Sequence, residues 1–287
     1  MRAAASLRAD SLVEGEYRLT AENFGRVAAM LRAQSGIHLP ETKATLVYSR
    51  LAKRLRALGL RNFDEYCALV DSPEGADERS AMLAALTTNV TRFYREQHHF
   101  DHLRDRVLAP MAETVRRGKR LRIWSSACST GEEPYSIALT LLSLIPDAAQ
   151  HDVRILATDI DPVVIEKAKA GVYSADGVAP IPPASRERHL ERVQDGRWRV
   201  KDHVRGLIAF KQLNLIGEWP MRGPFDIIFC RNVVIYFEEP TQDRIWGRFR
   251  SLLTSEGRLY IGHSERINID GYRSDGLTIY RLDGAAS

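Results

Sequence analysis

Hydrophobic residues in the first part of the chain recur with the spacing of amphipathic helices. After Thr20, which with Asn23 makes a suitable helix start, apolar positions repeat every three or four residues as far as Gly36. A second helix is expected over residues 42–58, with one apolar face formed by Val47, Leu51, Leu55 and Leu58. Gly59 is typical of the position just past a helix end. This pattern predicts a helical N-terminal region.

Two further helices are expected before the pattern changes. Asn62 is a suitable N-cap for a short helix that ends near residue 70. Residues 71–75 contain Pro and Gly and are expected to form a loop. A fourth helix is expected from about residue 77 to residue 87.

After about residue 120, short apolar runs alternate with helical segments. The runs typical of strands cover residues 121–124, 153–157, 225–230, 258–261 and 278–282. The helical segments cover residues 135–145, 162–170 and 241–253. Strands that alternate with helices indicate a mainly parallel sheet with helices on both faces. The predicted fold class is therefore α/β, with an all-α region before it; the family resemblance described below implies that the α/β domain is Rossmann-like.

The stretch from residue 172 to residue 212 breaks this alternation. It holds three prolines and then a charged, helix-like piece over residues 185–193. A turn at Asp195-Gly196 is flanked by possible strands at residues 198–200 and 207–210. We interpret the stretch as a small antiparallel β-subdomain inserted in the larger domain.

Length and composition agree with two domains. The chain has 287 residues, of which 44% are hydrophobic and 27% are charged, values ordinary for a globular protein. We expect a loose tail over residues 1–16, a helical domain over residues 17–90 and an α/β domain over residues 91–287. These values exclude low-complexity disorder and collagen-like or coiled-coil arrays.

Neither a membrane span nor a cysteine-based scaffold is expected. The longest apolar-looking stretch, residues 137–145, is far shorter than the ~20 residues that span a bilayer, and the N-terminus lacks a signal-like core. Cys67, Cys128 and Cys230 lie far apart and form no CxxC pair. This spacing argues against zinc, disulfides or another metal centre, and the cytoplasm is the expected location.

The positive charge is concentrated in the N-terminal part. Residues 1–120 hold 20 Lys and Arg against 15 Asp and Glu, whereas the remainder holds 21 against 22. The second helix carries a basic face formed by Arg50, Lys53, Arg54 and Arg56. This face is either an ordinary solvated surface or a docking site for an acidic partner. It has no interleaved aromatic residues, which argues against single-stranded nucleic acid.

The first candidate for chemistry is the segment 127–136, which follows a strand and precedes a helix. Its small residues let a ligand approach the backbone closely, as at other strand-to-helix turns of such sheets. It is neither a GxGxxG motif nor a P-loop, and the carboxylates of Glu132 and Glu133 would repel phosphate but suit a cation or an amino group. The alternative is a tight turn with two acids that complement the helix dipole.

The second candidate is Asp159, at the end of the next predicted strand. A carboxylate there can bind the two ribose hydroxyls of a nucleoside, whereas the alternative role is a helix cap, for which Asp161 is also suited. Together the two motifs favour an unphosphorylated nucleoside with a positive centre. S-adenosylmethionine fits this description better than NAD.

Two more motifs complete the candidate site. The apolar run 225–230 delivers Arg231 and Asn232 to the carboxyl end of a strand, with Tyr236 shortly after; the alternatives are a loop cap and core packing. Polar residues over 87–95 lie at the junction of the two domains, where they could close over a ligand or simply cap a linker. The histidines that follow, His98, His99 and His102, are expected to face solvent or cap helices rather than bind metal.

In combination these motifs resemble the CheR family of chemotaxis receptor methyltransferases, over roughly residues 20–285. The resemblance rests on Asn89-x-Thr91-x-Phe93-Tyr94-Arg95, Cys128-Ser129-Thr130-Gly131-Glu132-Glu133-Pro134-Tyr135-Ser136, Thr158-Asp159-Ile160-Asp161, Asn214-Leu215, Phe229-Cys230-Arg231-Asn232-Val233-x-Ile235-Tyr236-Phe237 and Gly262-His263-Ser264-Glu265. Tyr94 stands where the family often has Phe, and His189-Leu190 stands where an aromatic pair is expected.

The resemblance implies a protein-glutamate O-methyltransferase that uses S-adenosylmethionine and leaves S-adenosylhomocysteine. It implies cofactor contacts by Asn89, Thr91, Arg95, Glu132 or Glu133, Asp159, Asn214, Leu215, Arg231 and Asn232. It places Tyr236 and Arg95 at the reacting centre. The implied substrates are glutamates on the cytoplasmic helices of chemoreceptors, which the helical domain would dock, and some members grip a receptor tail through the β-subdomain.

Two other functions were weighed against this one. A nucleic-acid methyltransferase would need a flipped-base pocket with aromatic stacking, for which the sequence has no signature. A catalytically inactive module that binds S-adenosylmethionine for signalling is the main alternative, but the complete set of Asn89, Asp159, Arg231 and Tyr236 argues against it. Neither nucleic acid nor membrane insertion is expected.

Overall fold

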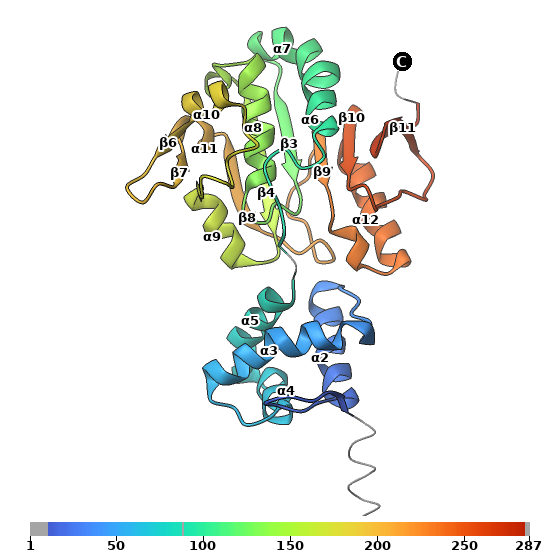
Figure 1. Ribbon diagram of the computed structural model, residues 1–287. Coiled ribbons are helices and arrows are strands. Elements are labelled where there is room, and N and C mark those ends of the chain that lie inside the picture. The colour runs from blue at the N-terminus through green and yellow to red at the C-terminus, as the bar shows by residue number, and fades with distance from the viewer. Residues whose placement is uncertain (1–10, 88, 285–287) are drawn as a thin grey trace, which may run out of the picture. The chain divides into compact units, whose positions relative to one another are not determined.

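The computed structural model describes residues 11–87 and 89–284. These residues form two compact units (Figure 1). Residues 11–87 and Tyr236–Glu238 form the first unit, and the described residues of Asn89–Ile235 and Glu239–Ser287 form the second. Among the described residues, no helix has both the length and the hydropathy needed to cross a membrane.

The first unit is built from helices that the sequence pattern predicts well. Its elements are β1 (Ser11–Val13), β2 (Leu19–Thr20), α2 (Ala21–Ser35), η1 (Glu41–Lys43), α3 (Ala44–Leu58), α4 (Phe63–Asp71), η2 (Pro73–Gly75) and α5 (Ala76–Leu86). The side chain of Thr20 accepts the N–H of Asn23 at the start of α2, and Asn62 caps α4 in the same way. Gly36 and Gly59 end α2 and α3 in the left-handed conformation.

Two expectations for this unit were wrong in detail. Residues 11–13, placed in a loose tail, form strand β1, which pairs antiparallel with β2. Leu58, assigned to the apolar face of α3, is 39% exposed because it lies in the last turn before Gly59. The other three residues of that face, Val47, Leu51 and Leu55, are fully buried. Residues 1–10 of the expected tail lie outside the described residues.

A short segment from far along the chain completes the first unit. Ile37 forms an antiparallel bridge with Phe237, and the N–H of His38 donates to the carbonyl oxygen of Tyr236 over 2.8 Å. Arg32 forms an ion pair with Glu238, 2.5 Å apart. The first unit is therefore not one continuous stretch of sequence.

The second unit is centred on a seven-stranded sheet in the order β11-β12-β10-β9-β3-β4-β8. The strands are β3 (Leu121–Ser125), β4 (Val153–Asp159), β8 (Ile208–Gln212), β9 (Phe225–Cys230), β10 (Leu253–Ile261), β11 (Tyr272–Gly276) and β12 (Ile279–Leu282). The five strands from β10 to β8 in this order are parallel, and β11 and β12 add an antiparallel edge beside β10. The order of strands reverses between β3 and β9, which makes this the switch point where such sheets bind ligands.

Helices cover both faces of this sheet. They are α6 (His98–His102), the π-helix η3 (Leu103–Leu108), α7 (Ala109–Arg116), α8 (Glu132–Leu144), η4 (Ala148–Gln150), α9 (Pro162–Ala170), α11 (Asp202–Arg205), η5 (Val234–Tyr236) and α12 (Glu239–Leu252). Tyr135 of α8 packs on Phe210, whereas Phe249 of α12 packs on Trp124. Trp124 and Phe210 point to opposite faces by strand register, so α8 and α12 lie on opposite faces.

The inserted subdomain is smaller than the sequence suggests. It holds an antiparallel sheet of three strands, β5 (Val172–Tyr173), β7 (Trp198–Val200) and β6 (Leu190–Arg192). Helix α10 (Pro183–His189) comes directly before β6. The expected fourth piece at residues 207–210 is instead β8, which pairs parallel with β4 in the main sheet. An isolated apolar run does not reveal which sheet it joins, and this explains the wrong assignment.

Candidate functional site

The turn between β3 and α8 is held to the end of β4 by a backbone contact. Ser129 has a left-handed φ of 47°, and its N–H donates to Oδ2 of Asp159 over 2.8 Å. Gly131 has a φ of 100°, and a Cβ there would lie 2.9 Å from the Cβ of Ala168, so only glycine fits the turn. The contact between Ser129 and Asp159 places the turn of small residues beside Asp159, the acid that is predicted to bind ribose.

Asp159 is the buried centre of a hydrogen-bond network. Its Oδ1 accepts the N–H of Asp161 over 3.0 Å, and the residue is only 8% exposed. Burial raises the pKa of Asp159, although the N–H groups of Asp161 and Ser129 oppose the shift. Asp161 caps α9 through the N–H of Val163 and also accepts Nδ2 of Asn89 over 3.1 Å. Asn89 and Asp159, which are 70 positions apart in sequence, therefore belong to one site.

Glu132 and Glu133 have different surroundings although they are adjacent. Oε1 of Glu133 accepts the hydroxyl of Ser125 over 2.8 Å, and its Oε2 forms an ion pair with Nη1 of Arg231 over 2.9 Å. Glu132 is less buried and accepts the hydroxyl of Thr130 over 2.7 Å. Burial raises the pKa of both carboxyl groups. Glu132 is thus the more exposed of the two carboxylates, and Glu133 is the one that holds Arg231.

Arg231 lies inside a polar cluster rather than on its surface. Its side chain is 2% exposed, and Nη2 lies 3.3 Å from Oε2 of Glu96 and also donates to the carbonyl oxygen of Arg95. Burial raises the pKa of Glu96, but Arg231 and His263 outweigh that effect and hold the pKa below its usual range. Because its guanidinium is occupied by Glu133 and Glu96, Arg231 is suited to contact a cofactor through its backbone. Sequence reasoning missed Glu96, which directly follows Arg95 in the motif that carries the resemblance.

Asn232 occupies a strained corner directly after β9. Its φ is 58°, in the left-handed region, and its Nδ2 lies 3.4 Å from Oε1 of Glu96. Its N–H donates to Oε2 of Glu265 over 3.0 Å. Asn232 is therefore held by two acids from other parts of the chain, Glu96 and Glu265.

Asn214 and Leu215 follow β8, at the edge of the sheet where Asp159 ends β4. The N–H of Leu213 donates to the carbonyl oxygen of Asp159 over 2.9 Å, and Oδ1 of Asn214 accepts the N–H of Ile216 over 3.1 Å. The carbonyl oxygen of Leu215 accepts both Nη1 of Arg248, over 3.1 Å, and Nε1 of Trp219, over 3.2 Å. Arg248 also lies over the Trp219 ring, 3.7 Å from its centroid.

The remaining predicted site residues have less definite surroundings. Nη1 of Arg95 donates to the carbonyl oxygen of Val90 over 2.9 Å, and Thr91 lies beside them in the same loop. Tyr236 is half-buried and belongs to the first unit, so its role at the reacting centre stays a prediction.

The basic face of α3 is largely occupied by contacts within the first unit. Nη1 of Arg50 donates to the carbonyl oxygens of Ala85, Leu86 and Thr87 at the end of α5. Arg54 forms an ion pair with buried Glu78, 2.5 Å apart, and Arg56 pairs with Glu16 on the surface. Lys53 is exposed. Of the four residues of this face, Lys53 and Arg56 are therefore the exposed ones, and Arg56 is paired with Glu16.

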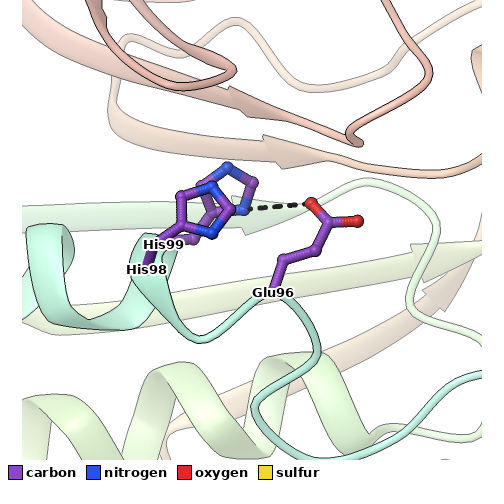
Figure 2. A group of neighbouring side chains, drawn as sticks. All are labelled: Glu96, His98 and His99. Carbon is purple, nitrogen blue, oxygen red and sulfur yellow. Dashed lines mark ion pairs between the residues drawn. The ribbon is translucent and has the colours of Figure 1, made fainter.

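The histidines after this loop do not behave as expected. His99 is fully buried, with Nε2 2.8 Å from Oγ1 of Thr278, and Nδ1 of His102 lies 3.0 Å from the hydroxyl of Tyr260. Figure 2 shows Glu96, His98 and His99 side by side, with potential ligand atoms within 4.8 Å of one another. Glu96, which lies two and three positions before these histidines, is an acidic partner that the expectation of no metal-ligand cluster did not take into account. The same carboxylate is already paired with the cation of Arg231, which opposes a metal ion at this place.

The residue types at the switch point fit a nucleoside with a positive centre. Three carboxylates, those of Asp159, Glu132 and Glu133, surround a turn that offers no basic side chain for a phosphate, since Arg231 is enclosed. This fold and site define the class of S-adenosylmethionine-dependent methyltransferases.

Comparison with known proteins gives the particular family. Residues 89–275 match the family model described as "CheR methyltransferase, SAM binding domain", and residues 22–87 match "CheR methyltransferase, all-alpha domain". The chain belongs to the CheR methyltransferase family. Both the S-adenosylmethionine cofactor and the methyltransferase reaction expected from the sequence are thereby confirmed.

Named relatives cover nearly the whole chain. A "Probable chemotaxis protein methyltransferase" of Rhizobium etli is 54% identical over 258 residues, which is 88% of this chain and 96% of the relative. "Chemotaxis protein methyltransferase 2" of Pseudomonas aeruginosa is 43% identical over 92% of this chain and 94% of its own length. The "Chemotaxis protein methyltransferase" of Escherichia coli is 40% identical over 92% of each chain. These matches support an enzyme of chemotaxis over the inactive signalling module.

Proposed function

We propose that this methyltransferase forms glutamate methyl esters on the cytoplasmic helices of chemoreceptors, and that it acts in the cytoplasm where those helices lie. The names of its relatives connect those proteins with chemotaxis. The observation that best supports the proposal is the carboxylate of Asp159 at the carboxyl end of β4, hydrogen-bonded to the turn that begins α8.

The proposed reaction requires that the acceptor carboxylate and the methyl group be aligned, and it does not require a strong base. Bound S-adenosylmethionine supplies an electrophilic methyl group on a sulfonium centre. A receptor glutamate is already ionised at neutral pH, because its ordinary pKa is about 4.3. The protein must therefore hold the incoming carboxylate oxygen at about 3–3.5 Å from the methyl carbon and exclude water. We assign that orientation to Tyr236 and Arg95.

The cofactor-binding roles are assigned residue by residue. Asp159 would accept hydrogen bonds from the ribose hydroxyls, and Asn89 would fix the loop that faces it. Asn214 and Leu215 would flank the base, while Thr91, Glu132 and the backbone at Arg231 and Asn232 would face the amino-acid part. Glu133 would act indirectly, by holding Arg231.

Calorimetric titration with S-adenosylmethionine and S-adenosylhomocysteine tests the cofactor site. We expect wild type to bind both and Asp159→Ala to bind at least tenfold more weakly, since its buried acceptor is lost. Asp176→Ala, which removes an exposed aspartate of the second unit, is the matched control and should bind as wild type does. Equal affinity of all three proteins would contradict the proposed role of Asp159.

The kind of product tests the substrate class. Receptor cytoplasmic fragments incubated with methyl-labelled S-adenosylmethionine should acquire label that mild alkali releases as methanol, as a carboxyl ester does. Alkali-stable label would instead indicate methylation of nitrogen and would contradict glutamate as the acceptor.

Receptor docking is assigned to the first unit. The exposed side chains of Lys53 and Arg56 on α3 would meet acidic residues of the receptor helix, which gives steering and register. We expect Lys53→Glu to raise the KM for the receptor without changing affinity for S-adenosylhomocysteine. An unchanged KM would remove Lys53 from the docking surface.

A receptor tail peptide is a second proposed contact, through the β-subdomain. The order β5-β7-β6 makes β6 an outer strand, and an extended peptide can add to such an edge. The guanidinium groups of Arg186 and Arg192 lie over the ring of Trp198 in β7, 5.4 and 4.9 Å from its centroid. Fluorescence anisotropy with labelled tail peptides should detect binding to wild type, and absence of binding by every receptor tail would contradict this contact.

A further inference from the structure

Glu265 is a buried carboxylate whose hydrogen-bond donors, within the part of the chain that the structure describes, are all backbone N–H groups. Its Oε1 accepts the N–H groups of Val233 and Val234, over 2.9 and 2.7 Å. Its Oε2 accepts the N–H groups of Asn232 and Gly262, over 3.0 and 2.5 Å. The residue is 3% exposed, so both oxygens are enclosed by these four donors.

These donors belong to the corner that follows β9. Three consecutive N–H groups point at one carboxylate because Asn232, with a φ of 58°, turns the chain back at the end of the strand. The left-handed conformation is costly for a residue with a Cβ, and it persists only where surrounding contacts enforce it. Glu265 supplies those contacts to the backbone, while Glu96 holds the side-chain amide over 3.4 Å.

The approach of Glu265 to this corner depends on a glycine. A Cβ at Gly262 would lie 2.5 Å from Nδ2 of Asn232, 2.8 Å from its backbone nitrogen and 2.9 Å from Oε2 of Glu265. No side chain can occupy that space without displacing the corner. The Gly262-His263-Ser264-Glu265 motif thus has a physical reason for both its first and its last residue.

The corner carries the residues to which we assign cofactor contact and orientation of the acceptor. Arg231 and Asn232 form it, and η5, which ends at Tyr236, starts at Val234. Burial raises the pKa of Glu265 against the opposing effect of its four N–H donors, which shows how much of its hydration is lost.

We infer that Glu265 is a positioning residue for the methyltransferase reaction: its carboxylate sets the backbone of residues 232–234 and, through it, the cofactor-binding corner and the start of η5. Because both of its oxygens accept backbone N–H groups, we assign it no direct contact with substrate or cofactor. The inference rests on the proposed function, since that function assigns the corner its role.

Glu265→Gln is the sharpest variant to test this. The amide keeps the shape of the side chain but presents an NH₂ group to two N–H donors that need an acceptor. We expect the Kd for S-adenosylhomocysteine to rise about tenfold to hundredfold, with binding stoichiometry near that of wild type. Amide hydrogen exchange at residues 232–234 should accelerate in the same variant. Glu256→Gln, an exposed glutamate on β10, is the matched control and should change neither quantity.

The readouts separate positioning from mere stability. A purely structural role would lower the melting temperature or the fraction of binding-competent protein but leave the Kd of the folded fraction unchanged, and that result would overturn the inference. If Glu265→Gln fails to fold, Gly262→Ala perturbs the same corner from its other side and should weaken S-adenosylhomocysteine binding likewise; an unchanged Kd there would overturn the inference too. Absence of binding by wild type would instead contradict the proposed function.

Discussion

Arg231 and Glu133 form an ion pair inside the second unit, with 2.9 Å between Nη1 and Oε2 and side-chain exposures of 2% and 11%. The pair joins the end of β9 to the first turn of α8, and Glu96 approaches the same guanidinium from the loop before α6. Three segments that meet at the switch point of the sheet are thereby held together by one cation.

Removal of that cation should destabilise the protein strongly. Arg231→Met leaves two acids without their partner in a buried place, a change that costs about 3–5 kcal/mol for buried pairs. Urea unfolding should show this loss, and Arg231→Met combined with Glu133→Gln should recover part of it. If the double variant is no more stable than Arg231→Met alone, the pair is not the source of the loss.

Stability should depend on pH through His99. Burial, together with Arg231 and His98, lowers the pKa of His99 to about 3. The unfolded chain, with a histidine pKa of about 6.5, binds one more proton between these values, so acidification from about pH 6.5 towards 3 removes stability. The contribution is at most about 1.4 kcal/mol per pH unit. Urea midpoints measured across this range should fall more steeply for wild type than for His99→Gln, and parallel curves would contradict the assignment.

Cofactor affinity should fall at mildly acidic pH. Burial raises the pKa of Asp159, so its carboxylate takes up a proton at a higher pH than an ordinary aspartate does. A protonated Asp159 accepts fewer hydrogen bonds from Ser129, Asp161 and a ribose. The Kd for S-adenosylhomocysteine should therefore rise as pH falls towards that pKa, by at most about tenfold per pH unit. Asp159→Asn should bind weakly with a flatter pH profile, whereas an identical profile would assign the titration to another group.

Among the basic residues of α3, replacement of Arg54 should lower the free energy of unfolding more than replacement of Lys53 does. Arg54→Ala leaves the carboxylate of Glu78, 7% exposed, with the hydroxyl of Tyr66 as its remaining partner described here, and should cost about 1.5–3 kcal/mol. Lys53→Ala should stay within about 0.5 kcal/mol of wild type. Urea unfolding of the two variants makes the comparison, and equal stability would contradict the structural role of Arg54.

Arg248 should matter for cofactor binding from a distance. It fixes the carbonyl oxygens of Leu215 and Gly217 and covers Trp219, so Arg248→Ala releases the loop that follows β8. We expect S-adenosylhomocysteine to bind about tenfold more weakly, because the free energy needed to order the loop after β8 then reduces the free energy of binding. Arg250→Ala, in the same helix but bonded to the carbonyl oxygen of Asp270, should leave affinity unchanged. Similar losses in both would indicate a general effect on α12.

The sequence predicts the helices and strands of this fold better than it predicts which strands pair with one another. Helix caps at Thr20, Asn62 and Asp161 are local, because each side chain bonds a backbone group two or three residues away. Residues 207–210 were assigned to the wrong sheet because the pairing of β8 with β4 is set by tertiary packing, which a four-residue apolar run does not encode.

The candidate site shows the same division. Residue types at strand ends were sufficient to predict Asp159 and the acidic turn, since the carboxyl ends of parallel strands meet. The sequence could not show that Arg231 is enclosed by Glu133 and Glu96, nor that Arg50 binds the end of α5. Those contacts join residues far apart in the chain, and a single sequence has no spacing rule for them.

The bridge between Ile37 and Phe237 limits where a coding sequence for this protein can be cut into two folded parts. The border between the two family models falls near residue 88, yet a fragment that stops there lacks the strand partner of Ile37 and the acid that pairs with Arg32. Recombination at that border would therefore separate the helical unit from a piece of its own structure. Exchange of the helical unit between related enzymes has to carry the 236–238 segment along or match it in the recipient.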